Sequence, residues 1–186
     1  MDGPFRDPQL RHRSAPRLET ERLILRHVEP ADVEYFAAAH ADEEVSRHVG
    51  GPIGREDAWR RGMTGAGFWG VLGIGVWAIE RRADRRTIGH VGFFDFQRDM
   101  TPSIAGEPEM GWIFSREAQG QGYATEAGGA ALDWFDATFG AISIPAIIAP
   151  DNLPSIRLAE RLGFERQPDA TYRGAPTAFF RRQPRG

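Results

Sequence analysis

The sequence predicts a single α+β domain built around a mixed, mostly antiparallel sheet. The chain has 186 residues, which is the length of one domain. Several predicted strands follow one another closely, as in hairpins, which favours antiparallel pairing. One long helical pattern stands between two strands, 109–114 and 141–149, and such a right-handed crossover makes these two strands parallel.

The first half of the chain predicts one strand followed by three helices. Alternating Leu and Ile residues favour a strand over 18–27. Pro30 and Asp32 then open a helix, as residues of these types often do. Two further helices are expected over 42–48 and 55–63, and the glycines after Met63 predict a loop.

The second half predicts a hairpin, two helices and the remaining strands. Aromatic and β-branched residues over 75–82 and 87–96 flank a polar turn at 83–86. After a loop at 101–107 come the 109–114 strand, a helix over 123–139 and the 141–149 strand, which Pro145 interrupts. A helix over 152–162 stops at Gly163, and short strands at 164–166 and 177–182 follow.

Composition narrows the class of protein. Hydrophobic residues make up 41% and the net charge is −3, so no basic excess points to nucleic acid. The absence of cysteine excludes disulfides, Fe–S clusters and a Cys nucleophile, and it fits a cytoplasmic protein. The five histidines lack ligand spacing, so no metal site is expected.

No membrane attachment is expected either. An uncharged run over 63–79 has 17 residues and five glycines, which is too short and too rich in glycine for a span. Residues 1–17 lack the apolar segment of a signal peptide and predict a flexible tail before a domain over 18–184.

The turn between the 109–114 strand and the long helix carries the clearest chemistry. It reads Gln119-Gly120-Gln121-Gly122-Tyr123-Ala124. Glycines and a helix N-terminus expose backbone N–H groups, which suits a phosphate or pyrophosphate, although two glycines can also serve as a plain turn. A P-loop is excluded because the chain has no lysine, and the dinucleotide fingerprint lacks its third glycine.

Two motifs together resemble a known family. Gln119-x-x-Gly122-x-Ala124 matches the Q/R-x-x-G-x-G/A signature of the GCN5-related N-acetyltransferases (GNAT). Asn152-x-x-Ser155 followed by Leu162-Gly163-Phe164 resembles a helix of the branch that contains the ribosomal-protein alanine N-acetyltransferases. The opening LETERLILR also looks like that branch, so the resemblance covers about 18–182.

The resemblance implies a fold, a co-substrate and a set of contacts. The family fold has a mostly antiparallel sheet with a splayed parallel central pair and helices on both faces, and its members commonly form homodimers. Acetyl-CoA is the donor, and its pantetheine arm pairs with the strand that here contains Trp112, Ile113 and Phe114. Its pyrophosphate is held by the loop, here the backbone of Gln119, Gly120, Gln121, Gly122, Tyr123, Ala124 and Thr125.

Candidate catalytic residues follow from the same resemblance, each beside a plainer alternative. Glu109 is placed to take the proton of an amine, with Asp95 as second choice, or it is a solvated acid at a strand edge. Ser155 is placed to protonate the leaving thiolate and Asn152 to contact the cofactor, or both only cap their helix. Arg161 is the favoured partner of a CoA phosphate among several arginines.

Other residues are weaker candidates for the site. Tyr172 is expected either to close the site or to be ordinary surface. Trp59, Phe68, Trp69 and Trp112 are candidate walls of the acceptor pocket, although such aromatic residues are more often core. Arg116 and Arg157 are further possible phosphate partners, but most of the 23 arginines are expected to be solvated.

These features together predict an N-acetyltransferase that moves an acetyl group from acetyl-CoA to a primary amine in a ternary complex. The acceptor stays open: a protein N-terminus, an aminoglycoside, a polyamine or another small amine. Two alternatives remain, a non-catalytic acetyl-CoA-binding sensor or partner subunit and an enzyme that uses another donor such as succinyl-CoA. Pro145 leaves the register of the cofactor-flanking strand open.

Overall fold

The computed structural model describes residues 14–140 and 142–184, which form two sheets. The first sheet has the order β1-β2-β3-β4-β6, with bounds Leu18–Glu19, Leu23–Arg26, Val76–Arg81, Thr87–Phe94 and Glu109–Phe114. The second has the order β5-β9-β10-β7, with bounds Met100–Thr101, Ala170–Tyr172, Ala175–Arg182 and Ile144–Ile148. β8 (Glu165–Arg166) pairs with β10.

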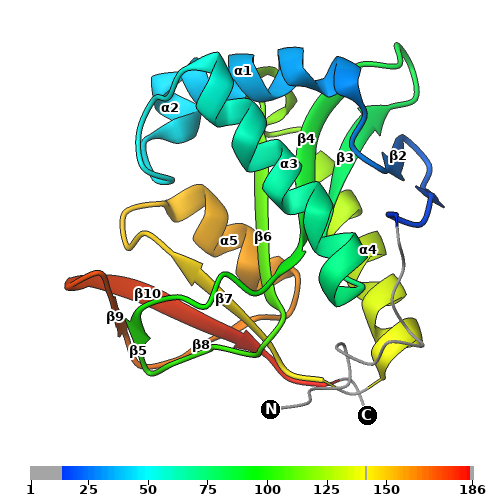
Figure 1. Ribbon diagram of the computed structural model, residues 1–186. Coiled ribbons are helices and arrows are strands. Elements are labelled where there is room, and N and C mark those ends of the chain that lie inside the picture. The colour runs from blue at the N-terminus through cyan, green and yellow to red at the C-terminus, as the bar shows by residue number, and fades with distance from the viewer. Residues whose placement is uncertain (1–13, 141, 185–186) are drawn as a thin grey trace.

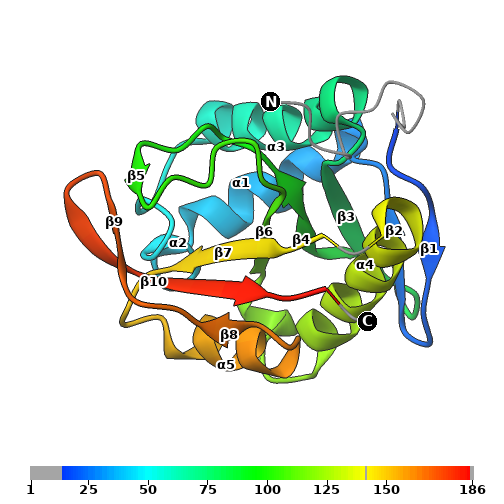
Figure 2. The ribbon, with the colours of Figure 1, turned by 90° about the horizontal axis from the view of Figure 1, so that it is seen from below.

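Helices cover both faces of this arrangement. α1 (Val33–Ala41), α2 (Glu43–Ser46) and α3 (Arg55–Leu72) lie on one side, and α4 (Tyr123–Phe139) and α5 (Leu153–Arg161) lie on the other (Figures 1 and 2). The main core lies where the first sheet meets α4 and includes edge-to-face contacts of Trp77 with Trp69 and Trp134, at centroid distances of 4.6 and 5.0 Å. The α+β prediction is confirmed.

The predicted parallel strand pair is wrong. Every strand pairing in the described part of the chain is antiparallel. β6 is an edge of the first sheet and β7 is an edge of the second, and the two lie close together without forming a ladder. β6 is held by β4 and β7 by β10, so the two strands separate and leave a gap with unpaired backbone groups.

The register identifies the backbone groups that face this gap. The N–H of Ser115 donates to the carbonyl of Ile88, so these two residues form a hydrogen-bonded pair. Along an antiparallel ladder, such pairs alternate with pairs that exchange no hydrogen bond. Trp112 belongs to the second kind, so its N–H and C=O point away from β4. On the second sheet, the carbonyl of Phe179 accepts from the N–H of Gln167, so the backbone groups of Phe179 point away from β7. Phe179 and its partner Ile147 on β7 therefore exchange no hydrogen bond. The backbone groups of Trp112 and Ile147 therefore face the gap from its two sides.

The same alternation explains Pro145. It stands opposite Arg181, two positions from Ile147, and so it is also in a pair that exchanges no hydrogen bond. Its missing N–H falls on the gap side of β7, where no ladder bond is lost. The strand keeps a regular register through the proline.

Helix α3 is longer than the sequence predicts. It runs to Leu72 instead of stopping near Met63, and Gly73 closes it with a φ of 74°. Two of its glycines are needed for packing, because a Cβ would lie 2.9 Å from the Phe36 ring at Gly62 and 2.8 Å from Val76 at Gly65. The glycine-rich stretch is therefore a close-packed helix face rather than a loop.

The N-terminal boundary also differs. The predicted tail 1–17 lies mostly outside the described residues, but its last part is packed on the domain. Ala15 is buried, and its N–H donates to Nδ1 of His27 at 3.2 Å. The indole of Trp77 donates to the carbonyl of Pro16 at 2.7 Å. The packed structure thus includes Ala15 and Pro16.

Candidate active site

A cleft of about 910 Å³ lies where the two sheets separate. Its walls come from β6 and β7, from α3 and the loop before it, and from the β9–β10 hairpin. Of the predicted site residues, it brings together Glu109, Trp112, Ile113, Asn152 and Ser155. Tyr172 also lines the cleft, so its expected role as ordinary surface does not hold.

Glu109 begins β6 and is buried, with 3% of its surface exposed. Arg98 donates to both of its carboxylate oxygens, at 2.5 and 2.9 Å, and also to the Tyr172 hydroxyl at 3.0 Å. Burial raises the pKa of Glu109 above its ordinary value, and the Arg98 guanidinium works against this shift. The carboxyl is therefore a buried acid in an ion pair at the cleft wall, not a solvated strand-edge acid.

Ser155 and Asn152 lie at the start of α5, on the far side of the gap from β6. The Ser155 N–H donates to the Asn152 side chain at 3.2 Å, so Asn152 is the helix cap that the plainer alternative describes. The indole N–H of Trp112 donates to the Ser155 hydroxyl at 3.2 Å. This contact leaves the hydroxyl proton of Ser155 available, because the oxygen is used as an acceptor.

The glycine loop presents free donors at the end of β6. Gly120 and Gly122 have φ values of 74° and 80°, which favour glycine. Within the described chain, none of the N–H groups of residues 120–125 donates a hydrogen bond that we find. Gln119 donates its side-chain amide to the carbonyl of Phe114 at 3.3 Å and so ties the loop to β6.

Arg22, in the β1–β2 turn, holds this loop from outside. It pairs with Glu126 on α4, donates to the carbonyl of Gln121 at 2.9 Å and stacks on Tyr123 at 4.6 Å. Sequence analysis did not single out Arg22. The only signal was its place in the LETERLILR segment.

Several candidates lie away from the cleft. Arg161 is exposed in the last turn of α5, whose nine residues place it roughly 13 Å along the axis from Asn152. Arg116 is paired with Asp42 and Glu44. Asp95, the second choice for the base, accepts from the N–H groups of Gln97 and Gly106 and so shapes the loop after β4.

The four aromatic residues predicted to line the acceptor pocket also differ in whether they reach the cleft. Of the four, only Trp112 is among the cleft residues. Trp69 is fully buried in the core, Trp59 packs against the buried cluster that includes Phe36, and Phe68 packs on Phe96 at 5.3 Å. Phe94 and Phe96, which the sequence did not single out, form the aromatic wall with Trp112.

Three histidines, His40, His48 and His90, also line the cleft, although the sequence predicts no role for them. His90 on β4 lies 3.2 Å from the Tyr35 hydroxyl, which donates to the carbonyl of Ile113 at 3.0 Å. His40 on α1 is 3% exposed, and its Nδ1 has no hydrogen-bond partner. Burial lowers the pKa of His40 to about 4 and that of His90 to about 3, so both rings are neutral near pH 7.

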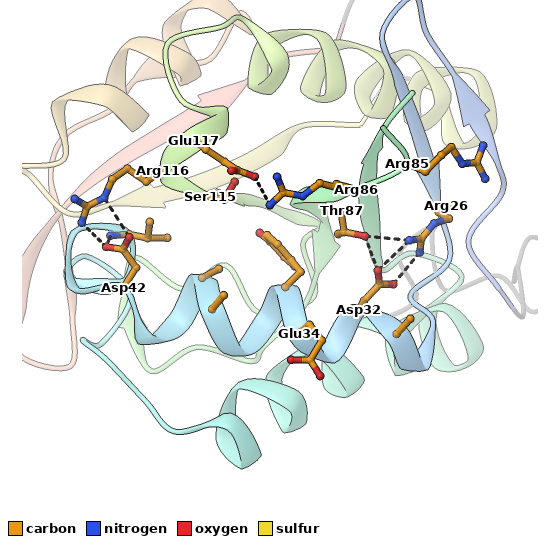
Figure 3. Close-up of a pocket in the computed structure, with 15 residues that line it drawn as sticks. Arg26, Asp32, Glu34, Asp42, Arg85, Arg86, Thr87, Ser115, Arg116 and Glu117 are labelled. Atoms are coloured by element: carbon orange, nitrogen blue, oxygen red, sulfur yellow. Dashed lines mark hydrogen bonds and ion pairs between the residues drawn. The ribbon is translucent and has the colours of Figure 1, made fainter. Parts of the chain in front are cut away.

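A second groove, between α1 and the start of β4, offers less chemistry. It contains the ion pairs of Arg26 with Asp32, Arg86 with Glu117 and Arg116 with Asp42 (Figure 3). Its other charged residues, Glu34 and Arg85, are paired with Arg55 and Glu80. Since these charges are matched within the protein, the groove offers no free charge for a ligand.

Comparison with known proteins identifies the family. The family described as "Acetyltransferase (GNAT) domain" matches residues 22–165. The chain belongs to the GNAT acetyltransferase family. It is 29% identical over 154 residues to an uncharacterized N-acetyltransferase, YoaA, of Bacillus subtilis, covering 82% of this chain and 84% of that one. An acetyltransferase structure from Agrobacterium tumefaciens is 29% identical with a TM-score of 0.79, covering 90% of this chain and 94% of that one.

More distant GNAT structures share the fold. A ribosomal-protein-S5-alanine acetyltransferase from Vibrio fischeri has a TM-score of 0.66 at 18% identity, covering 91% of this chain and 97% of that one. The aminoglycoside acetyltransferase AAC(6')-Ib, solved with coenzyme A, has a TM-score of 0.68 at 15% identity, covering 87% and 94%. The expected membership and the resemblance to ribosomal-protein acetyltransferases are confirmed.

Among the described residues, no helix is long and apolar enough to cross a membrane. Nor do three or more His, Asp or Glu side chains in the described part come together as a metal site would require.

Proposed function

We propose that this GNAT protein transfers an acetyl group from acetyl-CoA to a primary amine, directly and within a ternary complex. The observation that carries the proposal is the gap between β6 and β7. Unpaired backbone groups of Trp112 and Ile147 face this gap, and the cleft around it also contains Glu109 and Ser155. An amide-containing arm placed there gains the hydrogen bonds that the two strands do not give each other.

The residues present suit such a co-substrate. The free N–H groups of residues 120–125 and the positive end of the α4 dipole suit a pyrophosphate. The free backbone groups of Trp112 and the N–H of Phe114 suit the pantetheine amides, with Ile113 between them, and Asn152 faces the same cleft. When bound, acetyl-CoA supplies an acetyl thioester, which is reactive toward a neutral amine. Arg161 remains a proposed partner for a more distant phosphate.

Glu109 is the proposed acceptor of the amine proton. Its raised pKa makes its carboxylate a stronger base than an exposed glutamate, which suits proton transfer from an ammonium group. Arg98 fixes the carboxylate in place through two hydrogen bonds. The lone pairs that Arg98 leaves unused remain free to accept a proton, directly or through one water molecule.

The other two tasks fall to β6 and α5. The Trp112 N–H, unpaired and facing the gap, is the proposed donor to the acetyl oxygen as this oxygen gains negative charge. The Ser155 hydroxyl, whose oxygen already accepts from the Trp112 indole, is the proposed donor to the departing sulfur.

One observation favours a second candidate, a non-catalytic acetyl-CoA-binding module. Both oxygens of Glu109 already accept from Arg98, and an ion pair of this kind also serves purely to stabilise a fold. Such a module keeps the loop and the gap but does not move protons. Both candidates bind acetyl-CoA, but only the enzyme transfers the acetyl group to an amine.

Calorimetric titration with acetyl-CoA and free CoA tests the binding of the co-substrate, which both candidates require. We expect micromolar binding that is lost in Gly122→Glu, since a carboxylate there repels the pyrophosphate. Gly106→Glu is the matched control, because Gly106 also has a positive φ of 89° and open space around a Cβ. Absence of binding to either CoA species refutes both candidates. If acetyl-CoA binds but no amine in a broad screen is acetylated, the non-catalytic module is the candidate that remains.

A further inference from the structure

We propose that the acetyl acceptor is a small amine that also carries a carboxylate on an apolar body, as an amino acid does. Arg61 and Arg173, on opposite walls of the cleft, bind the carboxylate. This inference rests on the proposed function, because it concerns the amine side of the same cleft.

The charges that line the cleft carry the argument. Arg98 is matched by Glu109, and Arg60 is matched by Glu56 and Asp57. Arg61 and Arg173 also line the cleft, and neither has an acidic partner in the described part of the chain. Two guanidinium groups therefore face the cleft with their charge uncompensated, and no lining carboxylate is left unpaired.

Each of the two arginines is held in place by the fold. Arg61 lies on α3 and donates to the carbonyl of Val49 at 2.9 Å, which ties it to the loop before the helix. Arg173 lies in the β9–β10 turn and stacks on the Tyr172 ring at 5.3 Å. Its φ of 50° is unusual for a residue other than glycine. Guanidinium groups bind carboxylates through paired N–H donors, so both residues suit an anionic ligand.

The rest of the cleft is suited to an apolar body. Phe36, Phe94 and Phe96 line it, and the last two stack at 4.4 Å with Phe96 45% exposed. His40 also lines the cleft, but its Nδ1 is buried and has no hydrogen-bond partner in the described part of the chain.

The charge pattern also excludes one substrate class. A polyamine or an aminoglycoside carries several positive charges, and Arg61 and Arg173 repel them because no free carboxylate compensates. A single amine beside a carboxylate avoids this cost, since its own anion meets the arginines. Nearby positive charge also favours the neutral form of the amine, which is the nucleophile.

A matched panel of acceptors tests the proposal with the full-length protein. It contains apolar L-amino acids such as L-phenylalanine, the corresponding amino acid amides, peptides with a neutral N-terminal residue, spermidine and kanamycin. The amides keep the amine and the body but lack the carboxylate, and their amines lose a proton more readily. A preference for the acids is therefore not a matter of amine basicity.

We expect kcat/KM for the preferred amino acid to exceed that of its amide at least about tenfold, the ratio that about 1.4 kcal/mol of selective binding gives. In Arg61→Gln with Arg173→Gln, KM for the acid rises about tenfold or more while kcat and acetyl-CoA binding stay close to the wild type. Arg55→Gln, exposed at the start of α3 and outside the cleft lining, is the control and leaves the ratio unchanged.

Three results overturn the proposal while leaving the proposed function intact. These are equal or better transfer to the amides or peptides, preference for spermidine or kanamycin, and transfer to other amines but to no amino acid. A protein that binds neither acetyl-CoA nor CoA refutes the proposed function itself. The calorimetric titration therefore separates the two failures.

Discussion

The indole N–H of Trp112 donates to the hydroxyl of Ser155 at 3.2 Å across the boundary between β6 and α5. Trp112 lies on β6 of the first sheet, and Ser155 lies in the first turn of α5, which packs beside β7 of the second sheet. This single contact spans the gap proposed for the co-substrate. It joins the residue whose backbone N–H is the proposed oxyanion donor to the proposed proton donor.

Replacing Ser155 tests the role of this hydroxyl. We expect Ser155→Ala to lower kcat by on the order of 10²-fold, the contribution of a positioned general acid, with little change in acetyl-CoA affinity. Trp112→Phe removes only the indole donor, so kcat should fall less, about fivefold, as for one lost hydrogen bond. Steady-state kinetics with saturating acetyl-CoA measures both. Ser103→Ala, exposed and away from the cleft, is the control, and an unchanged kcat in Ser155→Ala contradicts the assignment.

The pH dependence of kcat/KM reports on Glu109. A base works only when ionised, and burial raises the pKa of this carboxyl, so activity should fall with decreasing pH at values above the ordinary glutamate range. Glu109→Gln should remove this acidic limb and most of the activity. Glu107→Gln, which changes a neighbouring acid paired with Arg181, should keep both. A profile of the Glu109→Gln variant that parallels the wild type shows that another group takes the proton.

Stability should fall in mild acid because of the two buried histidines. Their pKa values are lowered by burial to about 4 for His40 and about 3 for His90, while unfolded histidine titrates near 6.5. As the pH falls, the unfolded state therefore binds protons before the folded state does. The contribution of the neutral rings to the free energy of unfolding is complete above about pH 6.5. It is lost below that pH at up to about 1.4 kcal/mol per pH unit for each ring.

Urea unfolding at several pH values measures this loss. The variant His40→Gln should show a shallower fall in unfolding free energy than the wild type between about pH 6.5 and 4. Ser103→Ala, which alters an exposed side chain and no titratable group, should keep the wild-type slope. Equal slopes in all three proteins exclude His40 as a contributor.

Two glycines should respond in opposite directions to alanine. At Gly92 a Cβ would lie 2.2 Å from the backbone carbonyl oxygen of Gly75, so Gly92→Ala should destabilise the fold by about 1–3 kcal/mol. At Gly129, inside α4, a Cβ meets nothing within 4 Å, so Gly129→Ala should stabilise it by about 0.5–1 kcal/mol. Chemical denaturation compares the two, and a shift of the same sign in both contradicts the packing argument.

Local sequence patterns predicted several elements closely. The β6 strand and the α4 helix have the predicted bounds, because alternation and helical spacing are properties of neighbouring residues. The glycines of α3 misled the prediction, since a helix that packs tightly against Phe36 and Val76 uses glycine for contact rather than for a turn. β9, which no alternating pattern marked, owes its existence to pairing with β10.

The residues of the candidate site also differ in whether the sequence alone could identify them. Gln119 to Thr125, Glu109, Asn152 and Ser155 carried a motif or a chemically informative residue type, and sequence reasoning singled them out. Arg98 carried neither, because an arginine in a loop looks like any other until the fold places it on Glu109 and Tyr172. The unpaired charges of Arg61 and Arg173 are visible only once every other cleft charge has been matched with its partner.

The sequence by itself determined the family, the order of the elements and the loop that suits a pyrophosphate, because these depend on residues that are close in the chain. The resemblance implied a splayed central pair, but only the tertiary structure decided that β6 and β7 form no ladder with each other, and therefore that Trp112 and Ile147 present free backbone groups to one gap. Each strand is held by a different partner, β4 or β10, and the competition between these two ladders depends on residues distant in sequence. No local pattern records its outcome.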